Sequence, residues 1–418
     1  LAGGATPDAT GRQVVIALER MRAIRNVDAQ NATLTVEAGC TLAQVQQAAA
    51  AAGLCFPLSL GAEGSCRIGG NLSTNAGGVA VLHYGTARAL TLGLEVVLPD
   101  GRVWNGLRRL RKNNTGYDLR QLFIGAEGTL GIIAAAVLKL YPAPRDRAVA
   151  IARVPDLECV VRLLGFVRDQ SGDRVTGFEY LSGAALRCCR DYSQCPEVPF
   201  ADCQHAVLVE LRSSAADSGL AAVLETSLAA AYGQGLIEDA VVANSGPQMD
   251  AFWQVREAHL MEALVRAGAD ISCDVSVPVS QVPAFIVAAT RAVEALCRGL
   301  RVTPYGHIGD GNIHFDLVRP VAMADAEFLA HWDELTDAVY DVAVRLGGSF
   351  SAEHGIGQLK RRDMQAYVAP IELELMRTIK NALDPHNLMN PDKVIPAIDV
   401  PNASCAAVQP VVAGDGAA

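Results

Sequence analysis

Two histidines and a glutamate in the C-terminal half of the sequence have the chemistry of a metal site. His307 and His314 lie in the stretch Gly-His-Ile-Gly-Asp-Gly-Asn-Ile-His, and Glu353-His354-Gly355 follows about 40 residues later. Imidazole and carboxylate groups suit a divalent transition metal, and three protein ligands leave a coordination position open for substrate. We therefore predict a catalytic metal site formed by His307, His314 and Glu353, with Zn²⁺ as its ion and Mn²⁺ or Co²⁺ as alternatives.

The spacing of these residues requires a turn. A continuous strand would point His307 and His314 to opposite faces, because side chains alternate along a strand. The Gly309-Asp310-Gly311 insert favours a hairpin, since glycine adopts positive φ without strain and two returning strands can meet at one point. Residues 348–352 are predicted to form a strand that ends at Glu353, so His354 points elsewhere and is free for another role. Hairpin histidines that make only local hydrogen bonds are the alternative.

Composition bounds the class of protein. A chain of 418 residues, 50% hydrophobic and 19% charged, can form two or three domains with large cores. The net charge of −10 argues against a nucleic-acid partner. We expect neither a membrane-spanning helix nor a signal peptide. Eleven scattered cysteines without a Cys-x-x-Cys pair indicate reduced thiols, in the cytoplasm or, in a eukaryote, the mitochondrial matrix.

Alternating helical and strand patterns predict an α+β fold. In the N-terminal part, strands are expected at 14–18, 33–38, 94–98 and 102–104 and up to about Tyr141, with a helix between Thr41 and Gly53 and a short one after Leu119. In the C-terminal part, helices are expected at 155–170, 217–232, 250–266, 282–297 and 325–346, and strands at 176–180, 206–211, 236–242 and before Asp274.

The densest glycine segment lies in the N-terminal part. Small residues packed this closely let backbone N–H groups approach a ligand and form an anion-binding nest. A tight loop without a ligand is the alternative. The stretch comprises Gly69, Gly70, Asn71, Leu72, Ser73, Thr74, Asn75, Ala76, Gly77 and Gly78. A dinucleotide site of the Gly-x-Gly-x-x-Gly type is not indicated.

Several ordered motifs carry a family resemblance. Gly-Gly-Asn-x-x-Thr-Asn-Ala-Gly-Gly, Asn-Thr-Gly-Tyr-Asp-Leu and Gly-x-Glu-Gly-Thr-Leu-Gly-Ile resemble the FAD-binding domain of the vanillyl-alcohol oxidase and p-cresol methylhydroxylase flavoproteins. The 306–314 and 353–357 segments resemble the D-2-hydroxyacid dehydrogenase branch, and the likeness covers about residues 1–396. It implies FAD contacts from Gly3, Gly4, Gly69, Gly70, Asn71, Ser73, Thr74, Asn75, Gly77, Gly78, Tyr84, Gly85, Asn114, Thr115, Gly116, Tyr117, Asp118, Glu127, Gly128, Thr129, Gly131, Ile132, Ile133 and Asn390.

The resemblance also implies a domain plan. Residues 1–144 correspond to a PCMH-type FAD-binding domain, residues 145–396 to a substrate- and metal-binding FAD-linked oxidase domain with an antiparallel sheet, and 397–418 to a disordered tail. Relatives carry a glycine-rich pyrophosphate loop directly before the residues that match Leu1 to Gly4, and this loop is absent here. We therefore expect the sequence to be a fragment of a longer chain, with weak or lost FAD binding as the alternative.

The implied reaction is oxidation of a D-2-hydroxy acid such as D-2-hydroxyglutarate, D-lactate or glycolate. The acid chelates the metal, His354 takes the hydroxyl proton as general base, and hydride passes to flavin N5. Arg256 matches the carboxylate clamp of the family, with a surface salt bridge as the alternative, and Asn312 is expected to donate to substrate. Relatives of the 2-hydroxyglutarate type commonly have Lys where this chain has Ser272, which favours a monocarboxylate.

The sequence does not determine the electron acceptor or the assembly, and it is compatible with two rival functions. Reduced flavin must pass its electrons to an electron-transfer flavoprotein, a quinone or another acceptor, and a homodimer is a candidate assembly. Two His and one Glu also suit a metal-dependent hydrolase. A non-catalytic flavoprotein subunit of a multi-subunit oxidase is the second rival.

Overall fold

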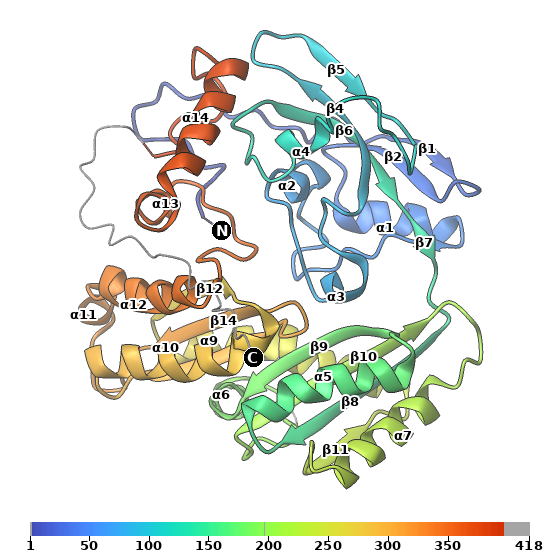
Figure 1. The fold of residues 1–418 in the computed structure, drawn as a ribbon, viewed down its shortest axis with the longest axis vertical. Helices are drawn as coiled ribbons and strands as arrows, with labels where there is room; N and C mark the ends of the chain where they lie inside the picture. The colour runs from blue at the N-terminus through green and yellow to red at the C-terminus, as the bar shows by residue number, and fades with distance from the viewer. Residues whose placement is uncertain (1, 196, 397–418) are drawn as a thin grey trace, which may run out of the picture.

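The computed structural model describes residues 2–195 and 197–396, which form two domains built on separate sheets (Figure 1). The tail predicted at 397–418 lies outside the described residues. Strands in both large sheets pair antiparallel, and helices cover the sheets, as an α+β fold requires. The predicted fold class is therefore confirmed.

The first domain is a five-stranded sheet in the order β1-β2-β6-β4-β5. Its strands are β1 (Ile24–Asp28), β2 (Thr33–Glu37), β4 (Thr91–Val97), β5 (Val103–Gly106) and β6 (Ile132–Lys139), and β3 (Leu54–Cys55) pairs separately with β7 (Tyr141–Pro142). Its helices are α1 (Leu42–Ala51), α2 (Ile68–Ser73), α3 (Val81–Tyr84) and α4 (Arg120–Phe123). Apolar side chains of α1, α2 and the central strands close its core.

The sequence predicts helix α1 correctly but wrongly predicts a strand in the segment before the first sheet. Thr41 caps α1 by accepting a hydrogen bond from the amide of Gln44, whose side chain accepts one from the Thr41 amide. The strand predicted at 14–18 is wrong, because these residues form no regular structure and Val14 is 85% exposed. An apolar run becomes a strand only where a partner satisfies its backbone groups.

The second domain has a seven-stranded sheet in the order β11-β8-β10-β9-β13-β14-β12. The strands are β8 (Asp146–Val154), β9 (Val175–Ser182), β10 (His205–Ser213), β11 (Asp239–Val242), β12 (Asp270–Ser276), β13 (Arg301–Gly306) and β14 (Asn312–Val318). The helices are α5 (Leu157–Ser171), α6 (Gly183–Tyr192), α7 (Leu220–Gly233), α8 (Gly246–Gln254), α9 (Leu260–Ala267), α10 (Val282–Leu296), α11 (Asp325–Leu329), α12 (Trp332–Arg345), α13 (Arg361–Tyr367) and α14 (Pro370–Leu383). One core contains residues of α5, α7, α10 and α12, and another contains residues of α6, α8 and α9.

Two long helices predicted in this domain are interrupted. The one at 250–266 consists of α8, a π-helical turn (Val255–His259) and α9, and such turns are frequent at functional sites. The one at 325–346 breaks between α11 and α12. The helices α6, α13 and α14 were not predicted, and α14 returns to the first domain, where Lys380 Nζ donates to the carbonyl of Thr129 (2.8 Å).

Within residues 2–195 and 197–396, one helical stretch, Val279–Leu296, is apolar and long enough to cross a membrane by length and composition. It contains α10, whose buried residues include Phe285, Ile286 and Val293 and belong to the core that also holds α12. These buried residues account for part of its apolar composition, since 33% of the stretch is buried. The cysteines of the described chain are all free, and Cys188, Cys189 and Cys203 pack in the core of α6 and α9.

Candidate functional site

The predicted hairpin brings the two histidines together. Strands β13 and β14 pair antiparallel with Tyr305 opposite His314, and His307 directly follows the end of β13. The turn needs glycine at Gly311, where φ is 85° and a Cβ would lie 2.0 Å from the Val277 carbonyl oxygen. The ring centroids of His307 and His314 are 5.6 Å apart.

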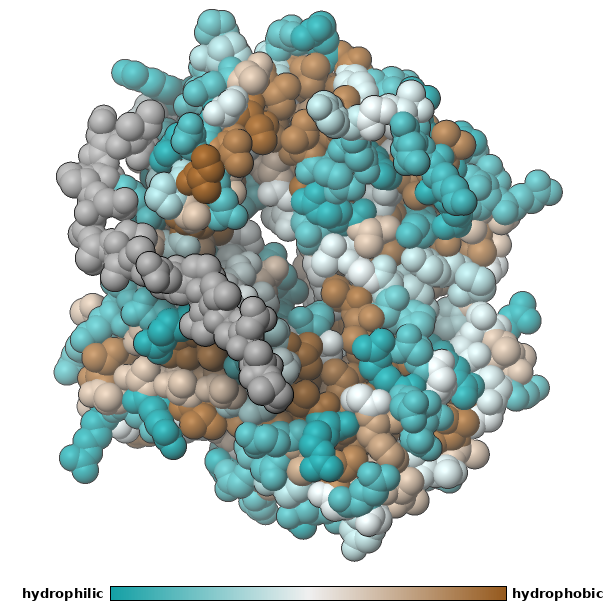
Figure 2. Space-filling view, in the orientation of Figure 1, coloured by the Kyte–Doolittle hydropathy of each residue, from teal (hydrophilic) through white to brown (hydrophobic). Residues whose placement is uncertain are grey.

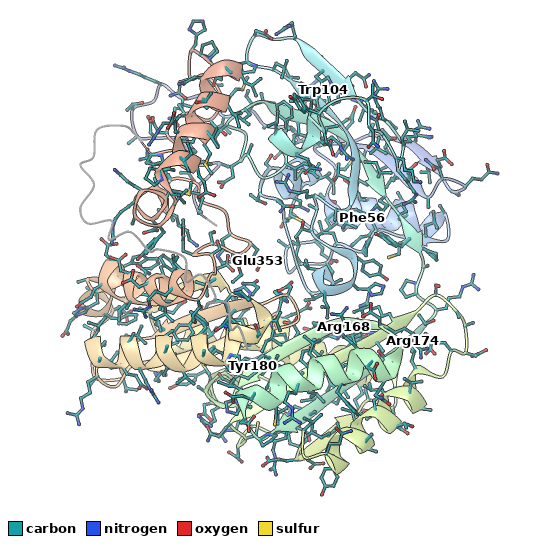
Figure 3. All side chains as sticks on the ribbon, in the orientation of Figure 1. Phe56, Trp104, Arg168, Arg174, Tyr180 and Glu353 are labelled. Carbon is teal, nitrogen blue, oxygen red and sulfur yellow. The ribbon has the colours of Figure 1, made fainter. Side chains whose placement is uncertain are left out.

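Glu353 and His354 lie on a loop between α12 and α13. The strand predicted at 348–352 is wrong, since only a single bridge joins Ser349 to Ser276. Two carboxylates hold the loop instead. Asp274 Oδ2 accepts hydrogen bonds from the amides of Glu353 and His354 (both 2.8 Å), and Glu127 of the first domain accepts from the two amides at 356 and 357. Figure 3 shows Glu353 at the junction of the two domains.

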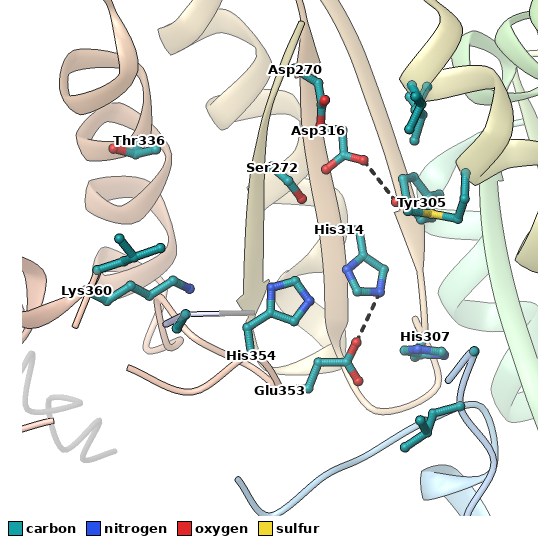
Figure 4. A pocket seen from close by; sticks show the side chains of 18 of the residues that line it. Asp270, Ser272, Tyr305, His307, His314, Asp316, Thr336, Glu353, His354 and Lys360 are labelled. Atoms are coloured by element: carbon teal, nitrogen blue, oxygen red, sulfur yellow. Dashed lines mark hydrogen bonds and ion pairs between the residues drawn. The ribbon is translucent and has the colours of Figure 1, made fainter. Parts of the chain in front are cut away.

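A cluster of possible metal ligands forms where the hairpin and the loop meet (Figure 4). Ligand atoms of Asp274, His314, Glu353 and His354 all lie within 4.8 Å of one another. His314 Nε2 is 3.5 Å from Glu353 Oε1. The predicted ligand His307 is not among these four residues, and its ring lies beside that of His314. The donor set of imidazole and carboxylate groups fits a divalent ion such as Zn²⁺.

Glu179 on β9 holds two of the predicted site residues, His307 and Arg256, through its carboxylate. Its carboxylate is 1% exposed and lies 2.7 Å from His307 Nδ1 and 2.8 Å from Arg256 Nε. Burial alone would lower the pKa of His307, but Glu179 outweighs it and raises that pKa to about 9. The Glu179 carboxylate on Nδ1 leaves Nε2 of His307 as the possible ligand atom, the usual arrangement behind a metal-bound histidine, and a bound metal would displace the proton that Nε2 carries at neutral pH.

The other two imidazoles are shifted the opposite way. Burial, together with the nearby charges of Arg256 and His307, lowers the pKa of His314 to about 3. Burial also lowers the pKa of His354, against the attraction of Asp274, whose Oδ2 lies 3.8 Å from His354 Nδ1. Both rings are therefore neutral near pH 7, the form that binds metal or accepts a proton.

A cavity of about 580 Å³ opens beside this cluster and is lined by both domains. The first domain contributes Ala2, Ser59, Leu60, Gly61, Gly78 and Val79 to its wall. The surface is hollowed between the domains in Figure 2. A Cβ built on Gly77 would lie 3.7 Å from Glu353 Oε2, so the glycine segment of the first domain reaches the cluster. The size and mixed lining suit a small ligand held between the domains.

Of the residues predicted to bind substrate, two line the cavity and one is hydrogen-bonded within the protein. Arg256 and Ser272 line the cavity, and Arg256 is 6% exposed on the π-helical turn, so the surface salt bridge is excluded. Asn312 donates through Nδ2 to Asp274 Oδ1 (2.8 Å) and to the Val275 carbonyl (3.0 Å). The Asn312 amide is thus already used within the protein, and its predicted hydrogen bond to substrate stays a prediction.

The glycine segment is helical in its first half, so the predicted loop is limited to residues after α2. Hydroxyl groups of Ser73 and Thr74 donate back to the carbonyls of Gly69 and Gly70. The remaining side chains also make local contacts: Asn71 donates to Cys66 Sγ, and Asn75 accepts from the Arg88 amide. Backbone groups around Gly77 and Gly78 are thus the part of this segment next to the cavity.

The other residues predicted to contact FAD form three groups: one at α3, one in the loop before α4, and one at the domain junction and the start of β6. Tyr84 packs edge-on against Tyr141, and Gly85 ends α3 with φ of 79°. A loop before α4, with Tyr117 95% exposed, does not line the cavity and consists of Asn114, Thr115, Gly116, Tyr117 and Asp118. The third group lies at the domain junction or the start of β6 and comprises Gly3, Gly4, Glu127, Gly128, Thr129, Gly131, Ile132, Ile133 and Asn390. The side-chain amide of Asn390 donates to the carbonyls of Gly4 and Glu127. Their cofactor roles stay predictions.

Sequence reasoning missed four residues of this site. Glu179, Tyr305 and Asp316 gave no motif, and Asp274 entered only as the residue at the end of a predicted strand. A partial signal exists in β12, because Asp270, Ser272 and Asp274 alternate along the strand and share one face. Burial raises the pKa of Asp316 to about 6, although the hydroxyls of Ser272 and Tyr305 oppose the shift.

Comparison with known proteins places this geometry in a family. Residues 143–394 match the model for the C-terminal domain of FAD linked oxidases, and residues 1–106 match an FAD binding domain. D-2-hydroxyglutarate dehydrogenase of Xanthomonas citri pv. viticola is 36% identical over 96% of this chain and 83% of its own. The mitochondrial D-2-hydroxyglutarate dehydrogenase of Danio rerio is 35% identical over 95% of this chain and 72% of its own.

A solved structure agrees with these matches at the level of the fold. p-Cresol methylhydroxylase with bound substrate has a TM-score of 0.66 and 15% identity, covering 90% of this chain and 78% of the other. The predicted PCMH-type fold and flavoprotein resemblance are confirmed. The chain belongs to the FAD-linked oxidases, oxidoreductases that act on CH–OH donors.

Proposed function

We propose that this protein oxidises a D-2-hydroxy acid to the corresponding 2-oxo acid, using FAD and a divalent metal. The observation that carries the proposal is the meeting of Glu353, His354 and the hairpin histidines with the glycine segment of the first domain at one cavity. Relatives named D-2-hydroxyglutarate dehydrogenase support the class of substrate.

The residues present fit both groups. Backbone at Gly77 and Gly78 lies at the face of the first domain that approaches Glu353 and the cavity, and it would hold the flavin there. His307, His314 and Glu353 would hold the metal. Asp274 is a poorer ligand because its carboxylate already accepts hydrogen bonds from Asn312 and from two loop amides. Bound flavin supplies a hydride acceptor, and a bound divalent ion supplies positive charge for the substrate oxygens.

The chain's own side chains then have separate tasks. Arg256 holds the substrate carboxylate through its terminal nitrogens, since Nε is taken by Glu179. His354 accepts the hydroxyl proton, and Asp274 fixes the position of its backbone. Glu127 ties the same loop to the first domain, which sets the distance between the base and the flavin side of the cavity.

The rival functions account for less of the structure. A metal-dependent hydrolase explains the cluster but gives the FAD binding domain no task. A non-catalytic flavoprotein subunit would not need His354 and Arg256 turned into one cavity beside the metal cluster. An electron-transfer flavoprotein or a quinone remains the proposed acceptor, and a homodimer remains the proposed assembly.

Anaerobic flavin reduction tests the proposal. The natural full-length protein, purified with its flavin, should lose flavin absorbance near 450 nm when a D-2-hydroxy acid such as D-2-hydroxyglutarate or D-lactate is added, as reduced flavin does. The L-enantiomers are the matched control. Removal of metal by a chelator should stop the bleaching, and added Zn²⁺, Mn²⁺ or Co²⁺ should restore it. Unchanged flavin with every D-2-hydroxy acid tried would refute the function.

A further inference from the structure

The cavity continues beyond the His and Glu cluster along the sheet. Ser272 on β12 lies opposite Asp316 on β14 in the register, and Asp270 is two residues further out on the same face. Figure 4 shows these three side chains in a row leading away from His314. We call Asp270, Ser272 and Asp316 the acidic end of the cavity.

Asp316 has unused capacity to accept hydrogen bonds. The residue is 2% exposed, and its Oδ2 accepts from the Tyr305 hydroxyl (2.9 Å). Its Oδ1 is buried and has no hydrogen-bond partner of good geometry among the described residues, although the Ser272 hydroxyl lies close enough to lower the pKa of Asp316. A buried carboxylate oxygen without a partner is costly, and a donor on a ligand would remove that cost.

Positive charge in the cavity lies elsewhere. Arg256 stands over the Tyr305 ring (4.9 Å to its centroid) and is paired with Glu179. Lys360 lies on the His354 side in Figure 4 and donates to the Phe350 carbonyl. Arg362 pairs with two aspartates of α12. Among the described lining residues, the acidic end therefore offers acceptors and a hydroxyl but no cation of its own.

We propose that the acidic end selects 2-hydroxy acids whose far end carries a hydrogen-bond donor, such as an amide, hydroxyl or ammonium group, over those with a second carboxylate. The inference rests on the proposed function and narrows its substrate class. The carboxylate next to the reacting carbon belongs at Arg256 and the cluster. The chain of the substrate then runs between the apolar residues Met261 and Leu264 of α9 and the strands, and its far end meets Asp270 and Asp316.

The expected selectivity comes from the different interactions that two ligands of the same length make at their far ends. A terminal donor gives Asp316 Oδ1 the hydrogen bond that it lacks. A terminal carboxylate cannot donate, and it would stand beside two aspartates in a site of low dielectric. The unfavourable contact thus excludes one substrate class while the new hydrogen bond favours the other.

The test compares D-2-hydroxyglutarate with its 5-amide and its 5-methyl ester on the flavin-loaded protein. The amide should have at least a tenfold higher kcat/KM than the dicarboxylate, with the ester between them because it is neutral but lacks a donor. Ser272→Lys places a cation between Asp270 and Asp316 and should reverse the order. Val321→Lys is the matched control, since Val321 is 77% exposed and does not line the cavity, so the same added charge should keep the wild-type order.

Binding gives a second readout that needs no turnover. Glutarate, its monoamide and its monomethyl ester lack the 2-hydroxyl group, so their dissociation constants can be measured by titration calorimetry without oxidation. The same order is expected, and Asp316→Asn should reduce the tenfold preference. A dicarboxylate that binds as tightly as the monoamide overturns the inference, whether or not the protein oxidises hydroxy acids. Failure of all D-2-hydroxy acids to reduce flavin, with the binding preference intact, refutes the proposed function alone.

Discussion

Replacing Glu179 by glutamine tests whether this buried carboxylate positions the site. Glu179 accepts from both His307 Nδ1 and Arg256 Nε at 2.7 and 2.8 Å. Glutamine keeps one acceptor oxygen, so its NH₂ group must face the other donor. Breaking a buried ion pair costs about 3–5 kcal/mol, and we expect the lower figure because one hydrogen bond survives. Loss of a carboxylate behind a metal-bound histidine lowers metal affinity by roughly 10- to 100-fold.

Two measurements and one control separate positioning from stability. Urea unfolding gives the loss of stability, and Zn²⁺ competition with a chromophoric chelator gives the metal affinity. Glu210→Gln is the control, because Glu210 is 2% exposed, accepts from Arg147 and Trp253, and does not line the cavity. It should lose similar stability and keep its metal affinity. The reasoning is refuted if Glu179→Gln and Glu210→Gln bind Zn²⁺ equally well.

Three further predictions concern the loop and the domain junction. Glu127→Gln should lower kcat about tenfold and speed hydrogen exchange at the amides of residues 356 and 357, because one of these two amides loses its acceptor. Unchanged hydrogen exchange would contradict this prediction. His354→Gln should abolish flavin reduction with metal retained, whereas His307→Ala should lose the metal; the reverse pattern would exchange their roles. Lys380→Met should cost about 3 kcal/mol in urea unfolding, because the buried Asp384 carboxylate loses its cation and keeps only the amides of Leu388 and Met389 as donors; a cost under about 1 kcal/mol would contradict the pairing.

The sequence predicted the parts of the site that local chemistry determines. The Gly309-Asp310-Gly311 insert predicts the hairpin that brings His307 and His314 together, and the structure shows that a Cβ at position 311 would collide with backbone. The cap at Thr41 is equally local. Arg256 was found through the family motif rather than through helical spacing, since the π-helical turn that buries it has no sequence signature.

The remaining parts depend on contacts between distant segments. Glu179 and His307 are 128 residues apart, and Glu127 and Gly357 are 230 apart, so no local pattern pairs them. The strand at 14–18 failed because no partner strand exists for it among the described residues. The contact of Asn312 could not be predicted for the same reason: its amide donates to Asp274, a residue on the neighbouring strand that the motif does not include.

The most direct test of the account is the position of the metal. Anomalous diffraction at the zinc edge, from crystals of the full-length protein loaded with Zn²⁺, should give one peak about 2.0–2.2 Å from a nitrogen of His307, a nitrogen of His314 and an oxygen of Glu353. His354 should lie beside the peak without bonding it. A peak bonded to Asp274 and His354 instead, or no peak at the cluster in metal-loaded protein, would contradict the central claim.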